Sequence, residues 1–126
     1  MEHVDAVWGR LSFRVQWASQ REHDRIRAAL ERFRDSLSAE RDSLVLLRLE
    51  ARMVEAAKAD RTNVMQHLRL GFVALRLGEL GGKAHYDDAA SEFQWAIDLR
   101  PDWPYPWFGM GLAEYGVGDS QVSFVA

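Results

Sequence analysis

Three groups of residues in this 126-residue chain are of types that could do chemistry. The run Gly81-Gly82-Lys83 resembles part of a phosphate-binding loop, the pair Asp87-Asp88 could act as acid and base, and histidines could hold a metal ion. A phosphate-binding loop needs a glycine five residues before its second one and a Ser or Thr after the lysine. Leu77 and Ala84 stand at those places. We therefore interpret residues 81–83 as a flexible turn.

The histidines and the aspartate pair have simpler explanations than catalysis. The four histidines, which show neither an HExxH pattern nor another paired ligand spacing, are His3, His23, His67 and His85. Asp87 and Asp88 stand where a helix is expected to begin, so we interpret them as caps that the helix dipole favours. No serine has a G-x-S-x-G setting, and the absence of cysteine excludes thiolate catalysis and disulfides. The sequence predicts no enzyme, no cofactor and no metal site.

Composition and charge narrow the class of protein further. A net charge of −3 provides no general attraction to nucleic acid. The arginines between Arg21 and Arg52 alternate with acids, so this span is interpreted as a solvated helix face with internal ion pairs. No run approaches the roughly eighteen apolar residues that cross a bilayer. The first five residues lack the basic and apolar regions of a signal peptide, and the compartment is left open.

Apolar spacing predicts helices along most of the chain. No glycine or proline occurs between Arg10 and Leu70. One stripe with helical intervals consists of Ile26, Leu30, Phe33 and Leu37. The stripe lapses over residues 36–43, where Asp42 or Ser43 could cap a second helix, so we favour a helical hairpin over one unbroken helix. Residues 1–20 also fit a helix, although 11–17 alternates like a strand that would have no partner.

Residues 68–79 and 108–119 resemble each other at an offset of forty. This alignment places Gly71 on Gly111 and Gly78 on Gly118. A glycine inside a helix usually marks the close approach of another helix, which we predict for Gly71. Gly78 is predicted to be a left-handed cap at the end of its helix. A further helix is expected over residues 86–101, where Pro101 would stop it.

These residues resemble the tetratricopeptide repeat family, whose pattern spaces small, aromatic and proline residues over a pair of helices. The matching residues are Leu70, Gly71, Gly78, Tyr86, Ala89, Phe93, Ala96 and Pro101, followed by Trp107, Met110, Gly111 and Gly118. His67 and Ala74 replace large aromatics of the pattern, and the turn at 79–85 is about six residues longer than usual. The resemblance is specific over 64–118, weaker over 24–63 and absent over 1–20.

The resemblance implies an all-α fold of antiparallel helix pairs stacked as a short right-handed solenoid. The expected segments are an N-terminal segment at 1–20, a degenerate repeat folded as a helical hairpin at 21–63, a repeat with a lengthened turn at 64–101, and the first helix of a truncated repeat at 102–126.

The aromatic and proline-rich stretch at 101–107 is predicted to be a structural corner, not a ligand platform or a docking peptide. Its prolines are Pro101, Pro104 and Pro106. The first ends one helix, and the other two stand at the start of the next, where proline costs no hydrogen bond. Trp107 is expected to pack between helices, whereas Trp103 and Tyr105 are expected to be partly exposed.

The resemblance also implies a function: a protein–protein interaction module whose concave face binds a peptide or protein. The residues expected to contact the partner are Gln66, Arg69, Val73, Arg76, Phe108 and Leu112. A truncated last repeat leads us to expect either that the chain is part of a larger protein or that a homodimer forms over an uncovered apolar face. That face would consist of Phe108, Met110, Leu112 and Val117. The aromatic-rich residues 1–20 could also occupy the groove.

Overall fold

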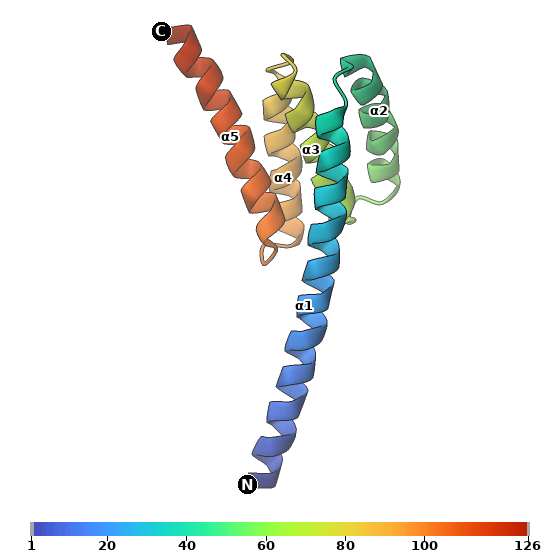
Figure 1. Ribbon diagram of the computed structural model, residues 1–126, viewed down its shortest axis with the longest axis vertical. Helices are drawn as coiled ribbons and strands as arrows, with labels where there is room; N and C mark the ends of the chain where they lie inside the picture. The colour runs from blue at the N-terminus through green and yellow to red at the C-terminus, as the bar shows by residue number, and fades with distance from the viewer. Residues whose placement is uncertain (1, 126) are drawn as a thin grey trace. The chain divides into compact units, whose positions relative to one another are not determined.

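The computed structural model describes residues 2–125, and it describes the side chains of residues 19–118. These residues form five helices joined by short turns (Figure 1). The helices are α1 (Glu2–Ala39), α2 (Ser43–Ala59), α3 (Val64–Glu79), α4 (His85–Leu99) and α5 (Pro104–Val125). The part of the chain that is described contains no strand, which confirms the all-α prediction. None of its helices has the length and apolarity that a membrane span needs.

The chain divides into two compact units, residues 1–32 and residues 33–126. Helix α1 is continuous through residue 20, so the expected boundary between an N-terminal segment and a hairpin does not coincide with a break in the helix. The aromatic side chains of residues 1–18 lie outside the described side chains. The larger unit contains the last turns of α1 and all of α2 to α5.

Polar caps separate the helices where the sequence predicts a turn. Asp42 precedes α2, and its side chain accepts a hydrogen bond of 2.9 Å from the amide of Leu44. Asn63 caps α3 in the same way through the amide of Gln66. These side chains satisfy amides that have no partner within the helix. The chain therefore forms two helices separated by residues 40–42, and not the single unbroken helix that was the alternative.

Helix α3 lies at the centre of the larger unit, where it packs against α2, α4 and α5. Its buried residues are His67, Leu68, Leu70, Gly71, Phe72, Val73, Ala74, Leu75, Leu77 and Gly78. Helix α4 adds Ala89, Phe93, Ala96 and Ile97 to the same core. Helix α5 packs against both α3 and α4.

Two aromatic rings of α4 are each enclosed by a pair of glycines. A Cβ atom at Gly71 would lie 2.5 Å from the ring of Phe93, and a Cβ at Gly109 would meet the same ring from α5. Tyr86 has the same relation to Gly78 and Gly116. The helices approach so closely that a side chain at these positions would overlap a ring. The predicted close approach at Gly71 is confirmed.

The other glycine predictions were wrong. Gly78 lies inside α3 and does not have the positive φ of a left-handed cap. Among the described residues, only Gly81 has a positive φ, of 110°. By its alignment with Gly71, Gly111 was expected at a close approach, but a Cβ there would meet no atom within 4 Å. Gly118, aligned with the expected cap Gly78, lies inside α5 and has no positive φ. The glycines of α5 that match those of α3 in packing come 38 residues later, not forty. A shift of two residues turns a helix by about 200° and presents its opposite face.

The corner at 101–107 is present, but its tryptophans were assigned wrongly. Helix α4 ends at Leu99, and Pro104 opens α5. Trp103 is only 6% exposed, and it lies edge-on to Tyr105 with the Arg100 guanidinium 4.6 Å from its ring centroid. Trp107 is 55% exposed, because the face of α5 that meets α4 is the one that carries the glycines at 109 and 116.

The turn before α4 also differs from its prediction. Residues 81–83 do form a turn, in which the amide of Gly82 donates to the carbonyl of Leu77. The N-cap of α4 is Ala84, without a side-chain cap bond, because the helix begins at His85. Asp87 and Asp88 therefore lie in the first turn, where their charge still suits the helix dipole, and do not cap the helix.

Candidate functional site

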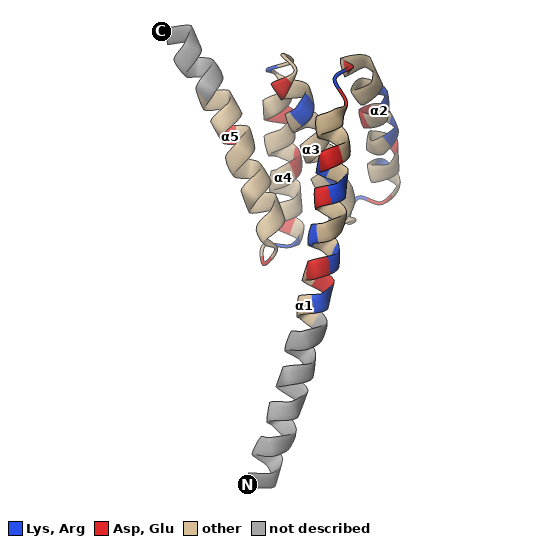
Figure 2. Ribbon diagram, in the orientation of Figure 1, with Lys and Arg blue, Asp and Glu red and all other residues tan. Residues whose placement is uncertain are grey.

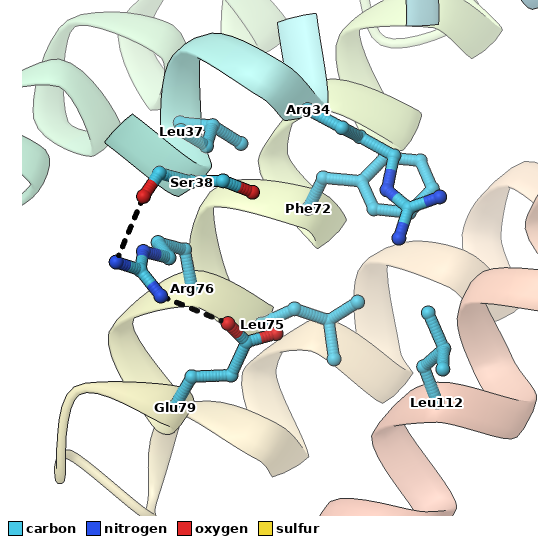
Figure 3. Close-up of a pocket in the computed structure, with 8 residues that line it drawn as sticks. All are labelled: Arg34, Leu37, Ser38, Phe72, Leu75, Arg76, Glu79 and Leu112. Carbon is cyan, nitrogen blue, oxygen red and sulfur yellow. Dashed lines mark hydrogen bonds and ion pairs between the residues drawn. The ribbon is translucent and has the colours of Figure 1, made fainter. Parts of the chain in front are cut away.

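Side chains from three helices surround a small pocket in the larger unit (Figure 3). Its lining consists of Arg34, Leu37, Ser38, Phe72, Leu75, Arg76, Glu79 and Leu112. The pocket has a volume of about 40 Å³, which suits the end of one side chain and is far below the volume of typical small-molecule sites. Two predicted partner-binding residues, Arg76 and Leu112, thus meet at one place.

Arg34 provides the most distinctive feature of this pocket. Its guanidinium carbon lies 5.1 Å from the ring centroids of both Phe72 and Phe108. Both distances are within the range of cation–π attraction. The described residues place no carboxylate within ion-pair distance of Arg34. The pocket therefore presents a positive charge that two rings hold in position, and Phe108, 53% exposed, extends this surface along α5.

The described part of α5 is almost free of charge, whereas α2 and the described part of α1 alternate basic and acidic residues (Figure 2). Phe108 and Leu112 of α5 thus supply apolar surface next to the charges of Arg34 and Arg76. We call the surface formed by Arg34, Phe72, Arg76, Phe108 and Leu112 the arginine groove. Apolar surface beside a fixed charge is what recognition of a charged peptide segment requires.

Arg76 has a structural role within this groove. Its guanidinium donates hydrogen bonds of 3.1 and 3.2 Å to the carbonyl of Glu40 and one of 3.2 Å to the carbonyl of Ser38. It also forms an ion pair of 3.1 Å with Glu79. The carbonyls at the end of a helix have no partner within the helix. Arg76 thus fixes the end of α1 to α3.

Replacing Arg76 by methionine, which keeps an apolar stem, is expected to destabilise the protein by about 1.5–3 kcal/mol, because hydrogen bonds from a charged donor are lost. Amide hydrogen exchange should accelerate over residues 40–43. Urea unfolding and exchange measure the two effects. Glu79→Gln is the control: its carboxylate is 54% exposed, so it should cost less than about 1 kcal/mol. Equal losses in the two variants would contradict the role given to the carbonyl contacts.

The remaining predicted site residues lie elsewhere. Val73 is fully buried and belongs to the core, because α3 is covered on several sides. Arg69 is half-buried, with its guanidinium 6.0 Å from the Phe33 ring centroid. Gln66 lies in the capped first turn of α3. Arg34 is not among the site residues predicted from the sequence, because it lies in the arginine-rich span interpreted as a solvated helix face. Its position beside Phe33 in the apolar stripe was the available signal.

A second polar cluster, which sequence reasoning also missed, joins α3 to α4. His67 is 2% exposed. Its Nδ1 and Glu92 Oε2 are hydrogen-bonded at 2.8 Å, and its Nε2 donates to the carbonyl of Arg61 at 2.8 Å. Trp95 stacks on the imidazole, with centroids 4.6 Å apart. The described residues contain no group of three or more acids and histidines arranged to hold a metal ion.

Glu50 of α2 lies near the first turn of α4. Its carboxylate is 3.9 Å from His85 Nδ1, which is also 3.4 Å from the carboxylate of Asp88. Burial raises the pKa of Glu50 above the ordinary 4.5, the charge of His85 lowers it, and Asp88 and Glu92 raise it again. Because the folded pKa is raised, the protein favours the protonated carboxyl. The stability associated with Glu50 is therefore present below the unfolded pKa and is lost as pH rises through the folded pKa.

Glu50→Gln is expected to remove the loss of stability that accompanies ionisation of Glu50, because the glutamine amide stays neutral at both pH values. Its stability relative to the unsubstituted protein should be greater at neutral pH than at about pH 4. Urea unfolding midpoints at both pH values measure the difference. Glu55→Gln, on the same helix with a side chain 74% exposed, should show no such change between the two pH values. A Glu50→Gln effect of the same size at both pH values would contradict the assignment.

A scan against protein-family models gave no match for this chain, and searches of curated proteins and of solved structures gave none either.

Proposed function

We propose that the chain is a tetratricopeptide-like interaction module, without catalytic activity, that binds a peptide or protein along the arginine groove. Three features support the family. Helices α3 and α4 are consecutive and pack against each other, Phe93 of α4 packs between Gly71 and Gly109, and a proline follows α4. In this proposal α3 and α4 form a helix pair, α5 begins the next pair, and the helices stack as a right-handed solenoid.

The observation that carries the functional proposal is the position of Arg34. A guanidinium without a carboxylate partner among the described residues lies between two rings, beside exposed apolar surface. Such a group binds a carboxylate more readily than a flexible surface arginine, because its side chain is already ordered. The expected partner is a peptide segment with an acidic residue next to an apolar one. Its acid would pair with Arg34, and its apolar side chain would contact Phe108 and Leu112.

Selection from a random peptide library tests this proposal. We expect enrichment of peptides that combine Asp or Glu with large apolar residues. Their affinity should fall about tenfold or more in Arg34→Gln, as expected for loss of a charge-assisted pair, and similarly in Phe108→Ser. Arg48→Gln, at an exposed arginine of α2, is the matched control and should bind normally. Failure to enrich such peptides, or equal affinity in Arg34→Gln and Arg48→Gln, would refute the proposal.

A second function, homodimerisation through α5, is favoured by a stripe of exposed residues. Trp107 is 55% exposed and Tyr115 is 75% exposed, with the exposed Gly111 between them on the same helix face. The face expected from the sequence is divided: Leu112 lines the arginine groove, whereas Met110 lines a separate surface pocket with Trp95 of α4. Light scattering across a concentration series tests this function. Dimers that dissociate in Trp107→Gln would support it, and a monomer at all concentrations would exclude it.

A further inference from the structure

A larger pocket lies between α2 and α4, with α3 as its floor, and the proposed function does not use it. Its volume is about 320 Å³, at the lower end of the range of roughly 300–1000 Å³ typical of small-molecule sites. It exists because α3 packs directly against both α2 and α4 and holds these two helices apart. We call it the α2–α4 crevice.

The inner walls of this crevice are apolar. Ala57 and Leu70 are buried, and Val54 is half-buried. Trp95, 45% exposed, forms part of the opposite wall. Its ring is held in place by stacking on His67 at an angle of 16° between the planes. A rigid aromatic wall facing aliphatic side chains suits a ligand with a flat or branched apolar body.

Most of the polar atoms at the base of the crevice are already paired. Both ring nitrogens of His67 are in hydrogen bonds, one with Glu92 and one with the carbonyl of Arg61. In the part of the chain with described side chains, Glu92 Oε1 is the only atom of this pair that is left without a hydrogen bond. The His67–Glu92 pair therefore shapes the base of the crevice, while the charge preference of the site depends on its rim.

The rim carries two cations. Lys58 and Arg61 are both exposed and line the crevice. Lys58 forms an ion pair of 3.2 Å with Glu55. Among the described residues, no carboxylate lies within ion-pair distance of Arg61. The hydrogen bond from His67 to the Arg61 carbonyl fixes the backbone from which this guanidinium extends. A positive rim above apolar walls complements a molecule that is apolar at one end and anionic at the other.

We propose that the α2–α4 crevice binds a small apolar carboxylic acid. The body of the ligand lies between Val54, Leu70 and Trp95, and its carboxylate pairs with Arg61 at the rim. The site is separate from the arginine groove, so one chain can hold a small molecule and a peptide at the same time.

Three probes with one body and different charges test this proposal on the full chain: 2-naphthoate, neutral 2-naphthamide and cationic 2-naphthylmethylammonium. Binding is followed by titration calorimetry and by shifts of the indole signal of Trp95 in NMR spectra. We expect naphthoate to bind about three- to tenfold more tightly than the amide, as is typical of one partly exposed ion pair, and the ammonium to bind most weakly. Tighter binding of the ammonium would assign the crevice to cations through Glu92 and would overturn the proposal, as would no binding of any probe.

Substitutions then locate the bound probe. Arg61→Gln should reduce the preference for naphthoate over the amide to about one, whereas Arg48→Gln should keep it. Ala57→Leu should fill the crevice and weaken the binding of all three probes about tenfold or more. If Ala57→Leu does not fold, Val54→Phe fills the crevice from the same wall. Arg34→Gln should leave naphthoate affinity unchanged, which separates this test from that of the peptide site. Unchanged naphthoate binding in both Arg61→Gln and the filled crevice would overturn the proposal.

Discussion

Replacing Phe93 by alanine is expected to destabilise the protein by about 3–5 kcal/mol, the usual cost of removing a buried phenylalanine. The ring is completely buried, and it lies between Gly71 of α3 and Gly109 of α5. It also packs edge-on against Phe72, with centroids 5.0 Å apart. Its removal therefore leaves a cavity between three helices. Urea unfolding followed by circular dichroism measures the loss.

The two glycines around this ring make the prediction sharper. Gly109→Ala should destabilise by about 1–3 kcal/mol, since the added Cβ overlaps the ring of Phe93. Gly111→Ala, two residues further along α5 and facing open space, should instead stabilise by up to about 1 kcal/mol through helix propensity. In the Phe93→Ala background, Gly109→Ala should lose its penalty, as a double-mutant cycle detects. If Gly109→Ala and Gly111→Ala changed the free energy of unfolding in the same direction, α5 would pack on α4 in another register.

Replacing His67 by leucine is expected to destabilise the protein by about 2–3 kcal/mol, although the two side chains have similar volume. The substitution leaves the Arg61 carbonyl and Glu92 without their partner and removes the stacking with Trp95. The loss in the urea midpoint should be accompanied by a shift of the indole NMR signal of Trp95, because the imidazole supports that ring.

Glu92→Gln is the matched control for His67. A carbonyl only accepts hydrogen bonds, so His67 Nε2 carries a proton toward Arg61, and Nδ1 is able to accept from a glutamine amide. This variant should therefore lose less than about 1 kcal/mol, whereas Glu92→Leu should approach the loss in His67→Leu. A harmless His67→Leu would show that the two hydrogen bonds contribute little net stability.

The helices could be predicted from the sequence because the signals that specify them are local. Asp42 caps α2 through an amide two residues away, and the prolines at 104 and 106 stand in the first turn of α5. The packing register could not be predicted in this way. Gly109 and Gly111 differ little as residues of one helix, and only the position of α4 beside them decides which glycine meets a ring.

The candidate site was predictable to a smaller extent for the same reason. Arg34 comes from a charged stretch of α1, and the rings that hold it belong to α3 and α5. His67 and Glu92 are 25 residues apart, on different helices. Val73 was expected at the surface, yet the helices around α3 bury it. In each case the partners are distant in the chain, so spacing along the sequence carries no information about the contact.

The two glycine pairs have a mechanical consequence. The rings of Tyr86 and Phe93 are seven residues apart on α4, and so are the glycines on each neighbouring helix. Sliding α5 along α4 by one helical turn, about 5.4 Å of rise, would take both glycines away from their rings and bring residues that carry a Cβ to the same places. Longitudinal shear between the helices is therefore resisted at two points. The register of α5 on α4 is thus specified at two rings, seven residues apart.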